Sequence, residues 1–292
     1  MSPRSPTNPA RADAKSAPGN FLDTMVKTVE EELRAGLYAR RPPRGDEPPP
    51  GRPRFAEALH RVSEGPALMV ELKHASPGRS QPRLPALSPE RFVRVCEDAG
   101  ISALSVIPQP YEFGGNLEEF GKVAHLSRLP LLFKDFIIDE AQIQAAKVHG
   151  ASAVLLLARL ARAQSLHGNL EGLVKAAHAR GLETLVEVHA KAEVPLALSS
   201  GTDALGVNAR DLGTLHLDPR SALPVLRELR KDPRPLVAMS GVEGPREVAL
   251  YGASGADAIL IGTAFARSHD PLAFLRGLRA EPPRNEAAVG DR

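Results

Sequence analysis

Eight short apolar runs, each followed by room for one helix and two loops, constrain the fold of this chain more than any other feature. Runs of this length between turn residues are typical of strands buried in a parallel sheet. Eight such β-then-α units predict an α/β chain folded as a (β/α)8 TIM barrel. A doubly wound open sheet competes, but the chain has no glycine-rich dinucleotide turn. The runs are Leu68–Lys73, Ala103–Ile107, Leu131–Lys134, Ala153–Leu157, Thr184–Val188, Ala204–Asn208, Leu236–Ser240 and Ala258–Gly262.

Local signals mark where the helices between these runs begin and end. Ser88-Pro89 and Asp218-Pro219 each combine an N-cap with proline at the first helical position. The segment from Asp139 to Gln142 fits a capping box. Glycines that can adopt a left-handed conformation should close five helices shortly before the next run. These glycines are Gly100, Gly150, Gly181, Gly201 and Gly255.

The regions outside the repeating pattern divide the chain. Residues 1–19 are rich in Pro, Ser, Ala and Arg without periodicity, which predicts a disordered arm. Apolar residues at helical spacing from Phe21 predict an extra N-terminal helix that ends near Leu37. The proline-rich residues 41–54 predict a stiff connector. We therefore expect one barrel domain over residues 20–280, including that helix and connector, and a polar tail over 281–292.

Composition excludes several classes of protein. A net charge of +2, from 37 basic and 35 acidic residues, argues against a nucleic-acid partner. No apolar stretch is long enough to span a membrane, and the N-terminus lacks the apolar core of a secretory signal. Cys96 is the only cysteine and is expected to be a buried hydrophobe, so the chain suits a reducing cytoplasm. The nine His show no metal-ligand spacing, so we predict no metal site.

Ionisable side chains stand where three of the apolar runs end, which is the end of a parallel barrel that carries its active site. Glu71 and Lys73 share one face because alternate strand residues point the same way. Lys134 and Glu187 end two further runs. Because an unpaired buried charge is costly, we expect these two lysines and two glutamates to balance one another in one pocket. The alternatives are a surface ion pair, a snorkelling Lys134 paired with Asp135, and a Glu187 bonded to the next loop.

The last two runs end in small residues. Ser240-Gly241 and Gly262-Thr263 can bring backbone N–H groups close to an anion, and Ser76 could add a hydroxyl. Plain turn chemistry is the alternative for the glycines. The residues alone therefore indicate a phosphate-bearing substrate and amine–carboxylate acid–base catalysis, without metal or cofactor.

Six segments resemble, in order and spacing, the indole-3-glycerol-phosphate synthase family, and the resemblance runs from about Phe21 to about Leu278. The Lys134-Asp-Phe-Ile and Asn208-Ala-Arg-Asp-Leu segments are the most specific to that family. The six segments are Glu71-Leu-Lys-His-Ala-Ser-Pro, Phe113-Gly-Gly-Asn-Leu, Leu132-Phe-Lys-Asp-Phe-Ile-Ile-Asp, Leu185-Val-Glu-Val-His, Gly206-Val-Asn-Ala-Arg-Asp-Leu and Ser240-Gly-Val.

The resemblance implies a carbon–carbon lyase of tryptophan biosynthesis that works without a cofactor. Its substrate would be 1-(2-carboxyphenylamino)-1-deoxyribulose 5-phosphate, a phosphorylated aromatic-amine sugar. Its products would be indole-3-glycerol phosphate, carbon dioxide and water. It implies a cytoplasmic enzyme that we expect to be a monomer, with contacts to other tryptophan-pathway enzymes left open.

The resemblance also implies catalytic roles for individual residues. Lys134 would be the general acid that protonates the ketone oxygen, and Glu187 would handle the proton that leaves with loss of water. Lys73 would hold the departing carboxylate and donate a second proton, with Glu71 orienting the amines and Asn208 fixing the substrate. Carbonyl activation needs an acid poised near neutral pH, which a lysine reaches by burial beside another cation.

The remaining site residues implied by the resemblance bind the substrate. Phe113 and Phe136 would bury the anthranilate ring, and Arg210 would fix the substrate from the sixth strand. Ser76 and Ser240 would contact the substrate near its phosphate, which Ser76, Gly241, Gly262 and Thr263 would bind.

Three departures from the family pattern leave a second function open. Met239 stands where the family usually has glutamate, and the segments Ile107–Pro110 and Ser76–Ser80 differ from the usual loops. A catalytically weakened paralogue that binds a phosphorylated ligand or a partner is therefore the alternative. A phosphoribosylanthranilate isomerase is a third option, which the segment at Lys134 disfavours.

Overall fold

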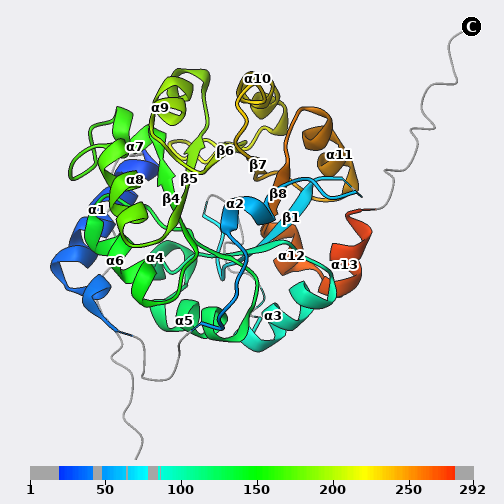
Figure 1. Cartoon of the computed structure of the whole chain (residues 1–292), viewed down its shortest axis with the longest axis horizontal. Helices are drawn as coiled ribbons and strands as arrows, with labels where there is room; N and C mark the ends of the chain where they lie inside the picture. The colour runs from blue at the N-terminus through cyan, green and yellow to red at the C-terminus, as the bar shows by residue number, and fades with distance from the viewer. Residues whose placement is uncertain (1–19, 42–47, 64, 78–84, 86, 280–292) are drawn as a thin grey trace, which may run out of the picture.

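The computed structural model describes residues 20–41, 48–63, 65–77, 85 and 87–279, and in these residues eight parallel strands form a closed barrel (Figure 1). Each strand pairs with its neighbours in chain order, and β8 closes the ring on β1. The predicted (β/α)8 barrel is therefore confirmed. The strands are β1 Ala67–Leu72, β2 Ala103–Val106, β3 Leu131–Phe133, β4 Ala153–Leu157, β5 Glu183–Val188, β6 Ala204–Asn208, β7 Leu236–Met239 and β8 Ala258–Ile261.

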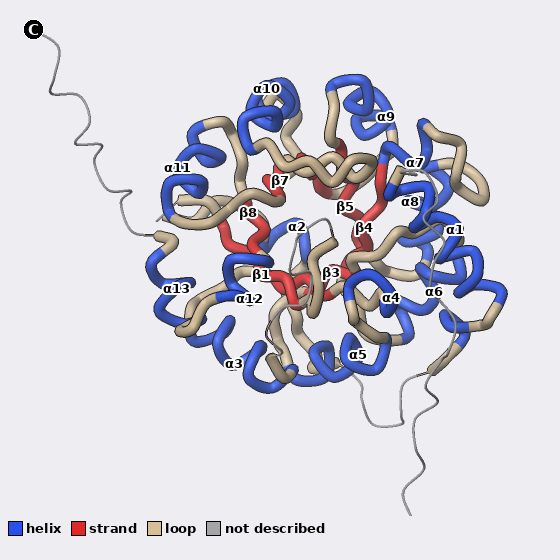
Figure 2. Tube along the Cα trace, turned by 180° about the vertical axis from the view of Figure 1, so that it is seen from behind, coloured by secondary structure: helices blue, strands red, loops and turns tan. Residues whose placement is uncertain are grey.

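Helices surround the barrel (Figures 1 and 2). The predicted arm 1–19 and tail 281–292 lie outside the described residues. The helices are α1 Phe21–Arg34, η1 Leu37–Ala39, α2 Phe55–Ala58, α3 Pro89–Asp98, α4 Pro110–Phe113, α5 Leu117–Leu126, α6 Glu140–Val148, α7 Ala158–Arg162, α8 Leu170–Ala179, η2 Lys191–Glu193, α9 Val194–Ser199, α10 Pro219–Leu229, α11 Pro245–Ala253, α12 Thr263–Arg267 and α13 Pro271–Gly277.

The predicted helix signals are confirmed. The Ser88 and Asp218 side chains accept hydrogen bonds from the first turns of α3 and α10, each of which starts with proline. Asp139 and Gln142 form the capping box of α6. The five glycines expected to end helices all have positive φ, between 65° and 106°. Cys96 is fully buried on α3, as expected for a small hydrophobe.

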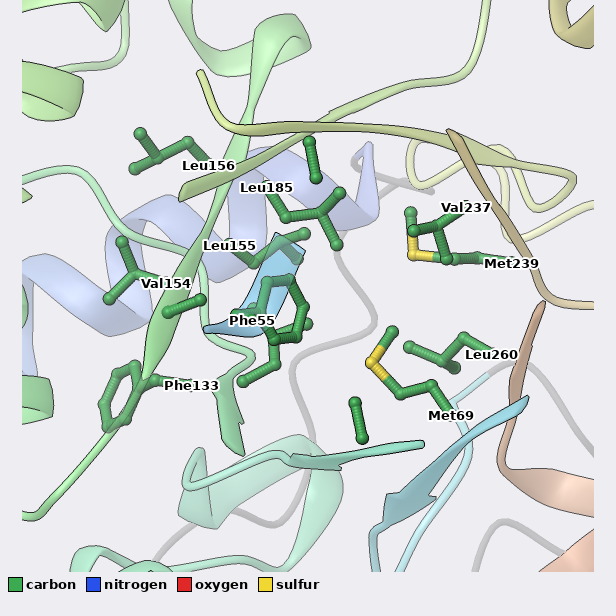
Figure 3. Close-up of a cluster of buried hydrophobic side chains, with 14 of the residues drawn as sticks. Phe55, Met69, Phe133, Val154, Leu155, Leu156, Leu185, Val237, Met239 and Leu260 are labelled. Carbon is green, nitrogen blue, oxygen red and sulfur yellow. The ribbon is translucent and has the colours of Figure 1, made fainter. Parts of the chain in front are cut away.

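Alternate strand residues pack inside and outside the barrel. Inside, apolar side chains from several strands converge, among them Met69, Leu155 and Leu260 (Figure 3). Outside, Phe133 of β3 packs edge-to-face on Phe120 of α5, with ring centroids 5.0 Å apart. Apolar side chains thus fill much of the interior, and the charged cluster of Glu71, Lys73, Lys134 and Glu187 lies where the strands end.

Helix α2 closes the end of the barrel where the strands begin (Figure 1). Its first residue, Phe55, is fully buried. The Phe55 N–H donates to Glu183 Oε2 at 2.5 Å, and Arg54 Nη2 donates to the other carboxylate oxygen at 3.0 Å. Because Glu183 starts β5, these bonds fix the helix across the closed end. The other end of the barrel, where the strands end, faces the viewer in Figure 2.

The N-terminal helix α1 lies against loops at the open end of the barrel, those that follow β2, β3 and β6. It ends at Arg34, three residues before the predicted Leu37, because Gly36 turns the chain with φ 70° into η1. Its first backbone N–H, on Phe21, donates to the Gly213 carbonyl at 2.9 Å in the loop after β6. The helix therefore runs from the loop after β6, at its first residue, to η1, which follows its last turn.

Candidate active site

One cleft at the open end of the barrel brings together all the site residues predicted from the sequence. It lies where the strands end, as expected for this fold. The predicted residues that line it are Glu71, Lys73, Ser76, Phe113, Lys134, Phe136, Glu187, Asn208, Arg210, Ser240, Gly241, Gly262 and Thr263.

Glu71 is the centre of the charge cluster in this cleft. Its Oε1 lies 2.8 Å from Lys73 Nζ and its Oε2 lies 3.3 Å from Lys134 Nζ. The carboxylate is 2% exposed, and the two lysine side chains are 13% and 19% exposed. Burial favours the neutral acid, but Lys134 and Lys73 outweigh it and lower the pKa of Glu71 to about 2. The alternative of a surface ion pair is therefore wrong.

The two lysines differ in how firmly they hold their protons. Burial lowers the pKa of Lys73, with Lys134 and Arg210 adding to the effect against Glu71. Burial also acts against Lys134, but Glu71 and Glu187 outweigh it and raise its pKa. The expectation that Lys134 is the lysine with the lowered pKa is wrong, because Lys134 faces two carboxylates. Lys73 is the lysine whose proton is more easily released.

Glu187 of β5 offers an unsatisfied carboxylate oxygen. Asn208 Nδ2 donates to its Oε1 at 2.8 Å, while Oε2 is buried without a hydrogen-bond partner among the described residues. Burial raises the pKa of Glu187 above its ordinary value, although Lys134 and Asn208 oppose this. A carboxyl group with a raised pKa and a free oxygen is suited to accept and return a proton.

Three phenylalanine rings form an aromatic wall of the cleft. Phe113 and Phe136 lie 6.1 Å apart, and the Phe21 ring meets them edge-on at 6.5 and 6.2 Å between centroids. Phe21 starts α1 and was predicted only as part of that helix. Phe21 is far from every strand in the sequence, so the sequence did not predict that it lines the cleft. Its place at the start of an added helix is the one signal that could have indicated this.

The loop after β6 lines the cleft over a longer stretch than the sequence predicted. Arg210 Nη1 donates to the Leu215 carbonyl at 3.0 Å, which folds the loop back on itself. Asp211 Oδ1 accepts from Arg159 Nη1 at 3.0 Å and from the Gly213 N–H at 2.6 Å. Leu212 and Leu215 line the cleft as a result. These two leucines reach the cleft because of the loop conformation. No periodic pattern in the sequence predicts such a position.

The turn after β7 has a backbone that favours an anion. Ser240 and Gly241 have φ of 68° and 76°, in the left-handed region. Tyr251 Oη donates to the Ser240 carbonyl at 2.9 Å, which holds that carbonyl against α11. Successive backbone N–H groups in a turn can converge on one point, which is a common anion-binding arrangement.

The turn after β8 lies against the charge cluster. A Cβ atom at Gly262 would stand 2.7 Å from Glu71 Oε1 and 3.1 Å from Lys73 Nζ. Gly262 was predicted only as a phosphate ligand, but its lack of a side chain also leaves room for the Glu71–Lys73 pair. Thr263 follows it as the first residue of α12.

Met239 fills the interior below the cleft. It is 1% exposed, lines the cleft, and its Cε would lie 2.5 Å from a Cβ atom at Gly206. Gly206 thus makes room for Met239. The side chain at position 239 therefore reaches the part of the cleft that Glu187 also lines.

The chain is similar to known proteins over most of its length. A family model described as indole-3-glycerol phosphate synthase matches residues 25–278. Indole-3-glycerol phosphate synthase 2 of Streptomyces coelicolor is 37% identical over 270 residues, which cover 92% of this chain and 96% of that protein. The Micrococcus luteus indole-3-glycerol phosphate synthase is 36% identical, over 78% of this chain and 84% of that protein.

Two further matches give weaker support for the family assignment, because one covers a small part of the relative and the other has low sequence identity. The multifunctional tryptophan biosynthesis protein of Schizosaccharomyces pombe is 38% identical over 73% of this chain, but the chain spans only 28% of that protein. A 3-hexulose-6-phosphate synthase from Salmonella typhimurium matches in structure with a TM-score of 0.52 and 16% identity, over 73% of this chain and 96% of that one. The structural match supports the barrel fold alone. Within the described residues, no helix has the length and apolarity to cross a bilayer.

Proposed function

The chain belongs to the indole-3-glycerol phosphate synthase family of tryptophan biosynthesis, and on that basis we propose how its residues perform the ring closure. The enzyme is a decarboxylating lyase of that pathway. Its substrate carries a carboxylate, an aromatic ring, a ketone and a phosphate. The cleft offers a complementary group for each of them.

Carbon–carbon bond formation needs an acid at the ketone oxygen. As the ring carbon that bears the carboxylate attacks the ketone carbon, Lys134 donates a proton to the ketone oxygen. Its raised pKa ensures that the amine is charged before the reaction. The carbon–carboxylate bond then breaks, carbon dioxide leaves, and the electron pair restores the aromatic ring. Lys73 holds the carboxylate until it departs.

Loss of water needs a second acid and a base. The new hydroxyl leaves as water with a proton from Lys73, whose lowered pKa makes that proton easier to release. Glu187 removes the proton from the sugar carbon next to the nitrogen, and its unsatisfied Oε2 is the atom that receives it. Asn208 holds Glu187 in position through its 2.8 Å hydrogen bond.

Substrate binding uses the remaining lining residues. Lys73, Lys134 and Arg210 line the cleft and carry the positive charges that can meet the two anionic groups of the substrate. Phe113 and Phe136 receive the aromatic ring, joined by Phe21. Ser76, Ser240, Gly241, Gly262 and Thr263 are the phosphate-binding residues in this proposal.

The observation that supports this assignment most directly is the buried Glu71 bridging two lysines from different strands, beside a carboxylate with a free oxygen. Complementation of a tryptophan auxotroph that lacks this step tests the function. Growth, together with release of carbon dioxide and indole-3-glycerol phosphate by the purified protein, is the expected result. Binding of a phosphorylated substrate analogue without turnover would instead favour the weakened paralogue.

The setting of the enzyme is part of the proposal. We expect a cytoplasmic monomer, and light scattering of the purified chain would reveal a larger assembly. The S. pombe relative is named as multifunctional, which motivates a test for association with other tryptophan-pathway enzymes. Co-purification with such enzymes from the native cell is that test, and their absence would contradict the association.

A further inference from the structure

A buried polar network joins the N-terminal helix to the end of β3, and the mechanism above makes no use of it. Tyr38 Oη of η1 lies 3.0 Å from Glu32 Oε2 of α1 and 2.7 Å from Asp135 Oδ2, the residue after Lys134. Gln109 Nε2 donates to Glu32 Oε1 at 3.0 Å. All four network side chains are at most 6% exposed.

The hydrogen bonds of Tyr38 require an extra proton in this network. A phenol hydroxyl carries one proton, yet carboxyl oxygens of both Glu32 and Asp135 lie within hydrogen-bond distance of it. If both groups were ionised, one carboxylate would face a lone pair of the phenol oxygen. One protonated carboxyl group removes the conflict, because it donates to Tyr38 while Tyr38 donates to the other carboxylate.

Glu32 is the better holder of that proton. Asp135 Oδ1 accepts from the Phe136 N–H at 2.8 Å and stands beside the charged Lys134, which both favour its ionised form. Burial and then the charge of Asp135 raise the pKa of Glu32 to about 7, and Glu31 on the same helix adds to this. Burial raises the pKa of Asp135 as well, but Asp135 has the compensating cation and amide.

We propose that neutral Glu32 and Tyr38 are positioning residues for the proton donor: they hold Asp135 and thereby place the adjacent Lys134 and Phe136. This inference rests on the role of Lys134 proposed above. Snorkelling Lys134 paired with Asp135 was an alternative from the sequence, and the structure directs Asp135 to Tyr38 instead.

The same network sets the aromatic wall. Gln109 Oε1 accepts from the Glu112 N–H at 2.8 Å and so caps α4, whose last residue is Phe113. Helix α1 supplies both Glu32 and Phe21. Helix α1, helix α4 and the end of β3 carry the aromatic wall and the proton donor. All three are therefore linked through the buried carboxyl group of Glu32.

If Glu32 holds this proton, the network responds to pH. The groups that face Glu32 are Tyr38 and Gln109 as neutral partners and Asp135 and Glu31 as negative ones. Because the pKa of Glu32 is higher in the folded state than in the unfolded state, its contribution is present at low pH and is lost as pH rises through about 7. Placement of Lys134 should weaken over that range.

Glu32→Gln tests this directly, because the amide keeps both hydrogen bonds and has no proton to lose. Its kcat/KM should equal that of wild type near about pH 6 and exceed it roughly threefold or more near about pH 8.5. The wild-type-minus-variant infrared difference should contain a band of a protonated carboxyl group near about pH 6 that disappears by about pH 8.5. Superimposable pH profiles, or no such band, would overturn the proposal.

Tyr38→Phe removes the central hydroxyl and separates positioning from stability. The matched control is Tyr111→Phe, since Tyr111 is 74% exposed on α4. For Tyr38→Phe we expect kcat to fall about tenfold with a smaller change in KM, since a displaced donor affects the chemical step more than binding. A lower melting temperature with unchanged kinetics would mean a purely structural network.

The two proposals can fail separately. If Lys134→Ala is inactive but Glu32→Gln and Tyr38→Phe behave as wild type, Lys134 is the acid and the network does not place it. If Lys134→Ala retains full activity, the assignment of the acid itself is wrong. Should Tyr38→Phe not fold, the pH profile of Glu32→Gln decides the question by itself.

Discussion

Carboxylates lie at both ends of the barrel, partly buried at the closed end and fully buried at the open end, and their hydrogen bonding differs. At the closed end, Glu183 accepts from Arg54 and the Phe55 N–H, and Asp203 accepts from the Thr184 N–H at 2.9 Å and contacts His178 at 2.8 Å. At the open end, Glu187 Oε2 is buried with no hydrogen-bond partner among the described residues, and Glu71 Oε2 is held by the 3.3 Å ion pair with Lys134.

The difference shows what each end contributes. Saturated polar groups at the closed end stabilise the fold, because leaving a buried acceptor unpaired costs about 1–3 kcal/mol. At the open end, the unpaired Glu187 Oε2 and the two neighbouring lysines are available to interact with a substrate. Changes at the closed end should therefore cost stability, and changes at the open end should cost activity.

Lys134→Ala should have the largest effect on activity. Removal of a general acid typically lowers turnover about 10²–10⁴-fold, because no other group then protonates the ketone oxygen. Steady-state kinetics measure the loss, with Lys175→Ala as control since Lys175 is 73% exposed on α8. Near-normal turnover in Lys134→Ala would mean that another residue is the proton donor.

Phe55→Ala should have the largest effect on stability. Truncating a fully buried phenylalanine leaves a cavity at the closed end and should lower the free energy of unfolding by about 3–5 kcal/mol. Urea denaturation measures this, and kcat/KM well below the melting temperature should change less than about twofold. A large loss of kcat/KM in a folded variant would break the separation between the two ends.

Gly262→Ala tests whether Gly262 leaves room for the Glu71–Lys73 pair at the open end. Because the new Cβ atom would crowd the Glu71–Lys73 pair, we expect kcat to fall roughly tenfold along with a rise in KM. Gly277→Ala is the matched control, since nothing lies within 4 Å of a Cβ atom there. A change in KM alone would confine Gly262 to phosphate binding.

Met239→Glu should have the smallest effect, visible mainly in the pH profile. A carboxylate at position 239, in the cleft that Lys73 and Lys134 also line, would favour the charged amines and raise their pKa, so activity should persist to a pH about one unit higher. Matched pH–rate profiles of wild type and variant measure the shift. Identical alkaline limbs would show that position 239 packs as an ordinary hydrophobe without tuning the lysines.

Much of the site could be predicted because its charged residues stand at the ends of strands that the sequence pattern identifies. Glu71, Lys73, Lys134 and Glu187 each end a recognisable apolar run, and a closed parallel barrel brings all such ends to one rim. Helix caps such as Asp139 could also be predicted, because hydrogen bonds between residues a few positions apart depend on the local sequence.

Other features required the folded chain. Phe21 joins the aromatic wall only because α1 packs beside the barrel, and Leu215 reaches the cleft only through the fold of its loop. The opposite pKa shifts of Lys73 and Lys134 depend on which carboxylates face each amine.

The amino-acid sequence by itself determined the number of strands, the helix caps at Ser88, Asp139 and Asp218, and the identity of the groups at the rim, because periodicity and capping are local properties. Tertiary structure alone decided that Glu32, Tyr38 and Asp135 share a buried network, since Tyr38 and Asp135 are 97 residues apart in the chain. Interaction energies between buried charges change steeply with distance and exposure to water, and only the packed structure sets both.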